Sequence, residues 1–192
     1  MHFTLEAQRI ASGYLTADAI AIDATCGNGF DTLFLAEQVG LHGVLYGFDI
    51  QELAIKKVSE RLLESGHLNQ CRLFVESHSN LETMLDPIHF GAVSVIMFNL
   101  GYLPLGDKSI VTTPESTLAA LDQSLDVLRT GGLISVLAYP GHPGGRIEAS
   151  QVSEWIEQNA NRLQFDRFQD PNNSNSPILW ALTKKEMATN TP

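Results

Sequence analysis

A glycine-containing segment near the N-terminus has the residue types and spacing of a nucleotide-cofactor loop. Asp23–Thr32 reads DATCGNGFDT, and Gly27 and Gly29 allow the backbone to turn sharply and approach a ligand closely. A further acid, Asp49, follows at about the 20-residue distance that suits the ribose diol of an adenosine-containing cofactor. The pattern therefore predicts a site for such a cofactor.

Two positions in this loop favour S-adenosylmethionine over a dinucleotide. Thr32 stands where the G-x-G-x-x-G fingerprint has its third glycine. Asp23 would repel a pyrophosphate but would suit the amino group and the sulfonium of S-adenosylmethionine. The alternative is that Asp23 only caps the turn. We expect methyl transfer, and an NAD-dependent oxidoreductase is disfavoured.

A polar residue and an aromatic residue follow the most apolar segment of the chain. Asn99 ends the segment 92–100, and Tyr102 comes three residues later. Amino-group methyltransferases often have Asn, two prolines and Tyr here, but this chain has Leu100-Gly101 in place of the prolines. The Asn carbonyl can accept a hydrogen bond from an amine and aim its lone pair at a methyl carbon, while the aromatic ring stacks on a base. The alternatives are a turn residue for Asn99 and a packing residue for Tyr102.

Other candidates follow two more of the predicted strands. Residues 139–146 read YPGHPGGR, and His142 is a candidate proton acceptor because imidazole titrates near neutral pH; alternatively it only bonds to backbone. His78 either contacts an adenine ring or caps the next helix. Lys108 and Arg146 are candidate phosphate contacts. The remaining histidines have no partner pattern and are expected at the surface: His2, His42, His67 and His89.

Hydrophobic periodicity predicts the elements that position these residues. The predicted strands are 19–24, 43–50, 71–76, 92–100, 133–139, 164–169 and 178–183. The predicted helices are 31–39, 51–65, 80–85, one beginning near Pro114 and 146–159. The Pro114 helix is expected to carry Leu128 on its apolar face and to end at Gly131-Gly132. Five β-α units and a closing hairpin indicate a single α/β domain over residues 1–192, with a doubly wound, mostly parallel seven-stranded sheet and a closing antiparallel strand.

Composition narrows the class of protein. The 192 residues include 12 Lys and Arg against 22 Asp and Glu, so the formal net charge is −10. This charge disfavours a broad basic surface for nucleic acid. Any RNA contact should have a small footprint or use a groove across a homodimer. Cys26 and Cys71 form no disulfide framework and no zinc pattern, so no metal is expected. No signal peptide or membrane span is predicted, and we expect a cytoplasmic protein.

Four motifs together resemble one known family. DATCGNGFDTLFLA, GFDIQ, FNLGYLPLGDKSIVT and YPGHPGG are similar to signatures of the small class I methyltransferases of the rRNA methylase family, from about residue 20 to about residue 148. The resemblance implies a Rossmann-like fold and S-adenosylmethionine as cofactor. It assigns these residues to the cofactor: Asp23, Gly27, Asn28, Gly29, Asp31, Asp49, Gln51 and His78. It places these around the substrate: Asn99, Tyr102, Asp107, Lys108, Tyr139, His142 and Glu148. Arg146, the candidate phosphate contact, completes the predicted substrate site on grounds of charge and position.

The same family includes bacterial tRNA 5-aminomethyl-2-thiouridine methyltransferases. The resemblance therefore implies methylation of the aminomethyl nitrogen on the wobble uridine of tRNA, giving 5-methylaminomethyl-2-thiouridine. Two alternatives stay open. One is a methyltransferase acting on rRNA or another RNA base, and the other is a scaffold that binds RNA without turnover.

Overall fold

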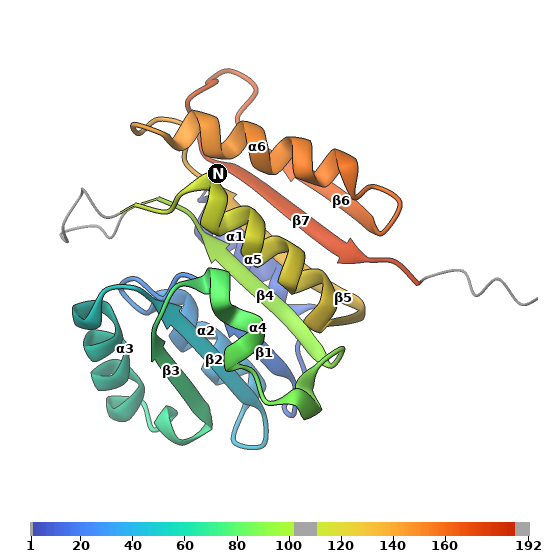
Figure 1. The fold of residues 1–192 in the computed structure, drawn as a ribbon. Coiled ribbons are helices and arrows are strands. Elements are labelled where there is room, and N and C mark those ends of the chain that lie inside the picture. The colour runs from blue at the N-terminus through green and yellow to red at the C-terminus, as the bar shows by residue number, and fades with distance from the viewer. Residues whose placement is uncertain (1, 102–110, 187–192) are drawn as a thin grey trace, which may run out of the picture.

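One seven-stranded sheet forms the centre of the computed structural model, which describes residues 2–101 and 111–186 (Figure 1). The strands, in spatial order, are β3 (Cys71–Val75), β2 (Val44–Asp49), β1 (Ile20–Asp23), β4 (Val93–Asn99), β5 (Leu128–Ala138), β7 (Ile178–Lys184) and β6 (Leu163–Phe168). The α-helices are α1 (Phe3–Ser12), α2 (Phe30–Val39), α3 (Glu52–Glu64), α4 (Leu81–Met84), α5 (Pro114–Val127) and α6 (Gly145–Gln158). Three short 3₁₀ segments are Leu68–Gln70, His78–Asn80 and Pro87–His89.

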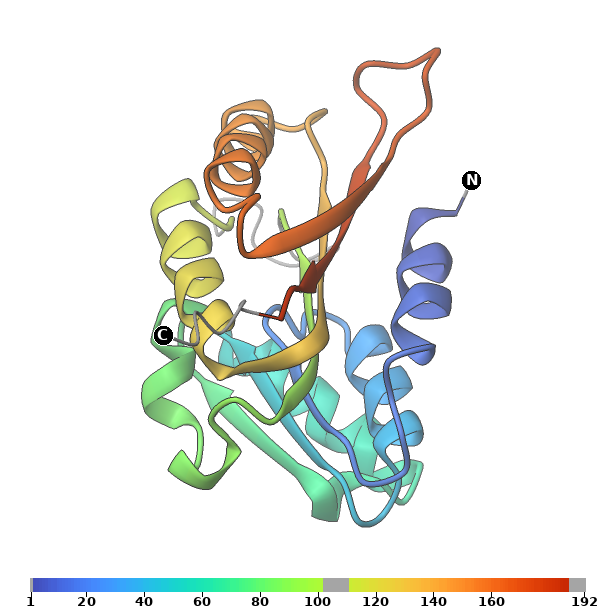
Figure 2. The same ribbon diagram turned by 90° about the vertical axis from the view of Figure 1, so that its right-hand side faces the viewer.

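Helices cover both faces of this sheet, as the edge-on view shows (Figure 2). Successive strand residues point to opposite faces. Ile22 of β1 and Ile96 of β4 therefore pack with α5 and α6, whereas Ala21 and Val95 pack with α1, α2 and α3. Two apolar layers result, and they explain why the central strands read as continuous apolar runs.

The chain reverses its direction across the sheet between β1 and β4. It proceeds from β1 outward to β2 and β3, then returns to place β4 on the other side of β1. Only β7 runs antiparallel to its neighbours, β5 and β6. The expected doubly wound α/β fold with a closing antiparallel strand is thus confirmed. After β1 the chain continues to α2 on one face of the sheet, and after β4 it continues to α5 on the other face. Ligands bind at such a reversal point, at the carboxyl ends of the strands.

Helix α1 was not predicted from the sequence. Its buried residues are Phe3, Ala7 and Ala11, spaced by four. A stripe formed mainly of alanine is a weak hydrophobic signal, so periodicity alone did not reveal the helix. Helix α1 packs beside α2 and against β5 and β7 of the sheet. This packing brings the N-terminal segment to the edge of the sheet that carries the site.

The boundary between α5 and β5 differs from the sequence prediction. Helix α5 begins at Pro114 as expected, but it ends at Val127 and not at Gly131-Gly132. Leu128 is the first residue of β5, where it pairs with Val93 of β4. Gly131 adopts a φ of 71° inside the strand, opposite a shift in the register of β4. The two glycines therefore form an irregularity within a long strand and do not end a helix.

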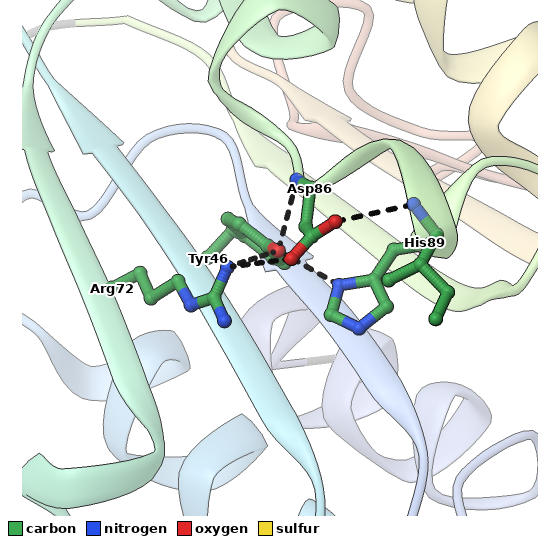
Figure 3. Close-up of polar contacts among 5 residues, drawn as sticks. Tyr46, Arg72, Asp86 and His89 are labelled. Atoms are coloured by element: carbon green, nitrogen blue, oxygen red, sulfur yellow. Dashed lines mark hydrogen bonds and ion pairs between the residues drawn. The ribbon is translucent and has the colours of Figure 1, made fainter.

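A polar cluster lies away from the carboxyl edge, on the α4 side of the sheet (Figure 3). The hydroxyl of Tyr46 accepts hydrogen bonds from Arg72 Nη1 at 3.0 Å and from the Asp86 amide at 3.2 Å. With two donors already accepted, the hydroxyl proton goes to His89 Nδ1, 2.7 Å away. The expectation that His89 is a surface residue without a partner is therefore wrong. Sequence could not show this because Tyr46 and His89 are 43 residues apart.

Candidate functional site

A cavity of about 670 Å³ opens at the carboxyl ends of the strands, at the reversal point between β1 and β4. This volume lies within the roughly 300–1,000 Å³ range of small-molecule sites. Its walls come from the glycine loop after β1, the ends of β2, β3 and β4, the loop after β5, and Thr4 of α1. The cavity has two halves, a cofactor half along β1 to β3 and an acceptor half between β4, β5 and α1.

The glycine loop forms the base of the cofactor half. Gly27 has φ 53° and Gly29 has φ 79°, a left-handed backbone that side chains other than glycine rarely adopt. A Cβ atom on Gly29 would also lie 3.0 Å from Val58 of α3. The loop then enters α2, whose first amide groups have no helical partner and favour an electron-rich ligand.

Asp49, at the end of β2, connects two loops. Its Oδ2 accepts from the Gly27 amide at 2.9 Å and its Oδ1 accepts from the Gln51 amide at 2.8 Å. The carboxylate also lines the cavity. Burial raises its pKa, and the two amide hydrogen bonds act against that rise. Each oxygen retains a second lone pair, so Asp49 can hold the loop and still accept from a ligand hydroxyl.

Asp23 lies beneath the loop and does not line the cavity. Its Oδ1 accepts from the Thr25 amide at 3.1 Å, and its Oδ2 accepts from the Thr32 hydroxyl at 2.6 Å. Burial, and then the charge of Asp31, raises the pKa of Asp23 to about 7. This geometry fits the alternative interpretation of Asp23 as a turn cap, and a direct contact with a cofactor amino group stays a prediction. The role of Thr32 is to donate the hydrogen bond that Asp23 Oδ2 accepts.

His78 presents one ring nitrogen to the cofactor half. Its Nδ1 lies 3.0 Å from the Ala24 carbonyl oxygen, so Nδ1 must carry the proton. The side chain is 7% exposed, its ring meets Phe98 edge-on, and burial lowers its pKa, which favours the neutral ring. Within the part of the chain that the structure describes, Nε2 has no hydrogen-bond partner. Nε2 is therefore a buried acceptor at the wall of the cavity.

Asn99 is the central polar residue of the acceptor half. Its amide N–H donates to the Thr25 hydroxyl at 2.7 Å, which ties the end of β4 to the glycine loop. Its side-chain Nδ2 donates to Asp31 Oδ2 at 3.3 Å, and Gln8 Nε2 donates to Asp31 Oδ1 at 2.7 Å. Burial raises the pKa of Asp31, while the hydrogen bonds from Gln8 and Asn99 lower it.

His142 and Tyr139 line the other side of the acceptor half. His142 Nδ1 lies 3.0 Å from the Pro143 carbonyl oxygen, which can only accept, so Nδ1 donates this hydrogen bond. The ring fits closely between two glycines, since a Cβ atom on Gly101 or Gly145 would lie 3.3 or 2.7 Å from Nε2. Burial raises the pKa of Tyr139, and the side chain of Thr4 acts against that rise.

Glu148 and Arg146 lie behind this wall. The buried Glu148 carboxylate accepts from Thr117 Oγ1 at 2.8 Å and from Thr112 Oγ1 at 2.9 Å, and burial raises its pKa. Thr112 Oγ1 in turn accepts from the Gly101 amide at 2.9 Å. Glu148 thus supports the wall. Arg146 is exposed and donates to Asn175 Oδ1 at 2.8 Å.

The structure brings most of the sequence-predicted residues to one cavity. Those that line it are Gly27, Asn28, Asp31, Asp49, Gln51, His78, Asn99, Tyr139 and His142. Those that lie beside or beneath it are Asp23, Gly29, Arg146 and Glu148. Tyr102, Asp107 and Lys108 lie outside the described residues. Thr4, Gln8 and Thr112 were not identified from the sequence. Thr4 and Thr112 line the cavity and Gln8 donates to Asp31, and these contacts join segments that are far apart in the sequence.

The donor set of the cavity fits S-adenosylmethionine. No group of three or more metal-ligating side chains occurs among residues 2–101 and 111–186. The cofactor half offers two carboxylates, from Asp49 and Glu76, together with a buried imidazole acceptor and a glycine loop. Carboxylates suit the ammonium and sulfonium charges of this cofactor and the hydroxyls of its ribose. The parallel sheet, its reversal point and this cavity define a class I methyltransferase architecture.

Known proteins agree with this assignment. Residues 45–184 match the family described as "Putative rRNA methylase", and the chain belongs to this family. A chloroplastic tRNA (mnm(5)s(2)U34)-methyltransferase from Arabidopsis thaliana is 38% identical over 182 residues, which cover 86% of this chain and 63% of the plant protein. The chain thus spans less than two thirds of that relative.

Two crystal structures show how closely the fold is shared. A protein from Clostridium thermocellum described as a "putative rRNA-methylase" is 36% identical, with a TM-score of 0.89 over 94% of this chain and 96% of that chain. A protein from Streptococcus mutans described as "a putative methyltransferase", in complex with SAH, is 28% identical, with a TM-score of 0.82 over 94% of this chain and 97% of that chain. The expected fold and family are confirmed. No helix of the described residues has the length and apolar character to cross a membrane.

Proposed function

We propose that this protein is an S-adenosylmethionine-dependent RNA methyltransferase that methylates the aminomethyl nitrogen of wobble 5-aminomethyl-2-thiouridine in tRNA. The observation that carries the proposal is the position of Asn99, an amide at the cavity wall tied directly to the glycine loop through Thr25. The 38% identity to a tRNA (mnm(5)s(2)U34)-methyltransferase supports the choice of substrate. The product would be 5-methylaminomethyl-2-thiouridine.

The cofactor half supplies the groups that would hold S-adenosylmethionine, which provides an electrophilic methyl group when bound. Asp49 would accept from the ribose hydroxyls, and the glycine loop leaves room for close approach. His78 Nε2 would accept from a donor such as the exocyclic amine of adenine. The complex of the Streptococcus mutans relative with SAH supports this cofactor.

The acceptor half would hold the amine in its reactive state. An alkylamine behaves like a lysine amine and is mostly protonated at neutral pH, so the site must favour the neutral form. Asn99 Oδ1 would accept an amine N–H and orient the nitrogen lone pair. The nitrogen gains a methyl group and gives up one proton, for which His142 is the candidate acceptor. Tyr102 is the candidate for stacking on the base.

The RNA contact should be small because the net charge is −10. Lys108 and Arg146 are candidate phosphate contacts, and each phosphate neutralised should make binding more sensitive to salt. A homodimer and a cytoplasmic location stay predictions. The rival function within the same chemistry is methylation of rRNA, which the description of the matched family favours.

One incubation separates these substrates. The protein is given S-adenosylmethionine with a labelled methyl group and either tRNA carrying 5-aminomethyl-2-thiouridine or undermodified rRNA, and the digested nucleosides are identified by mass spectrometry. We expect labelled 5-methylaminomethyl-2-thiouridine from the tRNA alone. Asn99→Ala protein, purified identically, controls for contaminating enzymes. Label in rRNA alone, or in neither RNA, would contradict the proposal.

A further inference from the structure

Asp31, on helix α2, orients the side-chain amide of Asn99, which lies at the end of strand β4. Asn99 Nδ2 lies 3.3 Å from Asp31 Oδ2. An ionised carboxylate only accepts hydrogen bonds, so the amide must turn its NH₂ group toward Asp31 and its carbonyl oxygen away. Among residues 2–101 and 111–186, no group donates a hydrogen bond to Asn99 Oδ1. This oxygen is also not fully buried. Within this part of the chain, Asn99 Oδ1 is therefore available to a ligand at the cavity wall.

Asp31 is itself held from its other side by Gln8. Gln8 Nε2 donates to Asp31 Oδ1 at 2.7 Å, so the two carboxylate oxygens receive one N–H each from α1 and from β4. The Asp31 side chain is buried, whereas Gln8 is partly buried on a helix anchored through Ala7 and Ala11. The paired bonds restrict rotation of the carboxylate, and the carboxylate restricts the amide.

The orientation decides what Asn99 can do. With Oδ1 toward the cavity, the amide accepts an N–H of an amine and leaves the nitrogen lone pair for reaction. A flipped amide would present NH₂, a donor that competes for the same lone pair. A carboxylate behind the amide also favours positive charge on a nitrogen as a methyl group is added.

We propose that Asp31 and Gln8 are positioning residues that set the amide of Asn99 for an amine acceptor. The inference rests on the proposed function, because it needs an amine at Asn99. It differs from the role that the family resemblance implies for Asp31, which is contact with the cofactor. Helix α1 thereby becomes part of the acceptor site, although it carries none of the motifs.

A double-mutant cycle tests the proposal. Single-turnover rates on the modified tRNA are measured for Asp31→Asn, Gln8→Leu, Asn99→Ala and the two double variants that contain Asn99→Ala. We expect losses of at least 20-fold for Asp31→Asn and about 5-fold for Gln8→Leu. In the Asn99→Ala background each loss should shrink to less than about twofold. Losses that simply multiply would overturn the proposal.

Cofactor affinity and a matched variant separate positioning from cofactor binding and from a loss of stability. Calorimetric affinity for S-adenosylhomocysteine should stay within about threefold of wild type in Gln8→Leu and Asp31→Asn. A large loss in Asp31→Asn would make Asp31 a cofactor ligand instead. Glu6→Gln, two residues from Gln8 on α1, changes a side chain that pairs with exposed Arg9, and it should leave the rate unchanged. An equal loss in Glu6→Gln would mean that α1 acts only through stability.

A substrate-free measurement keeps the proposal separate from the proposed function. In protein labelled with ¹⁵N-asparagine, the side-chain NH₂ signal of Asn99 is identified by its absence in Asn99→Ala. It should shift in Asp31→Asn and in Gln8→Leu, but not in Glu6→Gln. An unmoved signal would show that the contacts do not control the amide. If wild type fails to methylate the tRNA, the proposed function fails while this spectrum still decides the contact.

Discussion

The two halves of the cavity are built in different ways. The cofactor half is held mainly by backbone groups, because Asp49 accepts from the Gly27 and Gln51 amides and the glycines set the path of the loop. The acceptor half is held by side chains that meet across long sequence separations, such as Gln8, Asp31 and Asn99. The first half can therefore bind a shared cofactor, while the second can be tuned to a particular acceptor.

The largest expected loss of affinity tests the cofactor half. Asp49→Ala removes the acceptor for a ribose diol and leaves two loop amides without a partner. Two charge-assisted hydrogen bonds contribute about 3 kcal/mol together, so affinity for S-adenosylhomocysteine should fall about 100-fold by calorimetry. Asp49→Asn, which keeps one acceptor oxygen, should lose less. Unchanged affinity in Asp49→Ala would remove Asp49 from the cofactor site.

A smaller loss of affinity for S-adenosylhomocysteine is expected from substitution of His78. His78→Asn keeps a donor for the Ala24 carbonyl but removes the acceptor at Nε2. Loss of one neutral hydrogen bond of about 1 kcal/mol should weaken S-adenosylhomocysteine about 5-fold. His78→Gln, whose oxygen can replace Nε2, is the matched variant and should recover part of the affinity. A loss in His78→Gln as large as in His78→Asn would assign the effect to packing.

The pH dependence of binding should differ between S-adenosylmethionine and S-adenosylhomocysteine. The pKa of Asp23 is raised to about 7, so this buried carboxyl is largely protonated at pH 6 and ionised at pH 8. S-adenosylmethionine carries one more positive charge than S-adenosylhomocysteine and should gain several-fold in affinity from pH 6 to pH 8, whereas the homocysteine should gain less. Asp23→Asn should reduce this difference. Equal pH slopes for the two ligands in wild type would show that Asp23 does not act on the cofactor charge.

The smallest effect on the site is expected from the polar cluster at Tyr46 (Figure 3). Tyr46→Phe removes the hydroxyl that joins Arg72, Asp86 and His89. The free energy of unfolding should fall by about 1–3 kcal/mol, with S-adenosylhomocysteine affinity within twofold of wild type. A large loss of affinity would couple this cluster to the cavity and break the separation between the two regions.

The same cluster should make the folded protein less stable as the pH falls below neutral. Burial lowers the pKa of His89, and its Nδ1 must accept from Tyr46. The unfolded chain therefore binds this proton more readily than the folded chain. The stabilisation is complete above the unfolded pKa of about 6.5 and is lost as the pH falls below it. His89→Gln, which keeps an acceptor without titrating, should flatten the change in melting temperature between pH 7 and pH 5.

The difference between the halves also explains what the sequence could reveal. The glycine loop and Asp49 lie within one β-α-β segment, so their spacing alone predicted their place in the cavity. Gln8 and Asp31 are 23 residues apart, and Asp31 and Asn99 are 68 apart. No periodicity or spacing rule connects such pairs, and the alanine stripe of α1 hid the helix that supplies Gln8. The end of α5 was misplaced because glycines serve both helix ends and strand irregularities.

The central claim is that the acceptor half positions the amine without binding the cofactor, and Asn99→Ala tests it most directly. Its single-turnover rate on tRNA carrying 5-aminomethyl-2-thiouridine and its calorimetric affinity for S-adenosylhomocysteine are measured on one preparation. We expect the rate to fall at least about 100-fold and the affinity to stay within about threefold of wild type. A near-normal rate, or a loss of affinity that matches the loss of rate, would contradict the account.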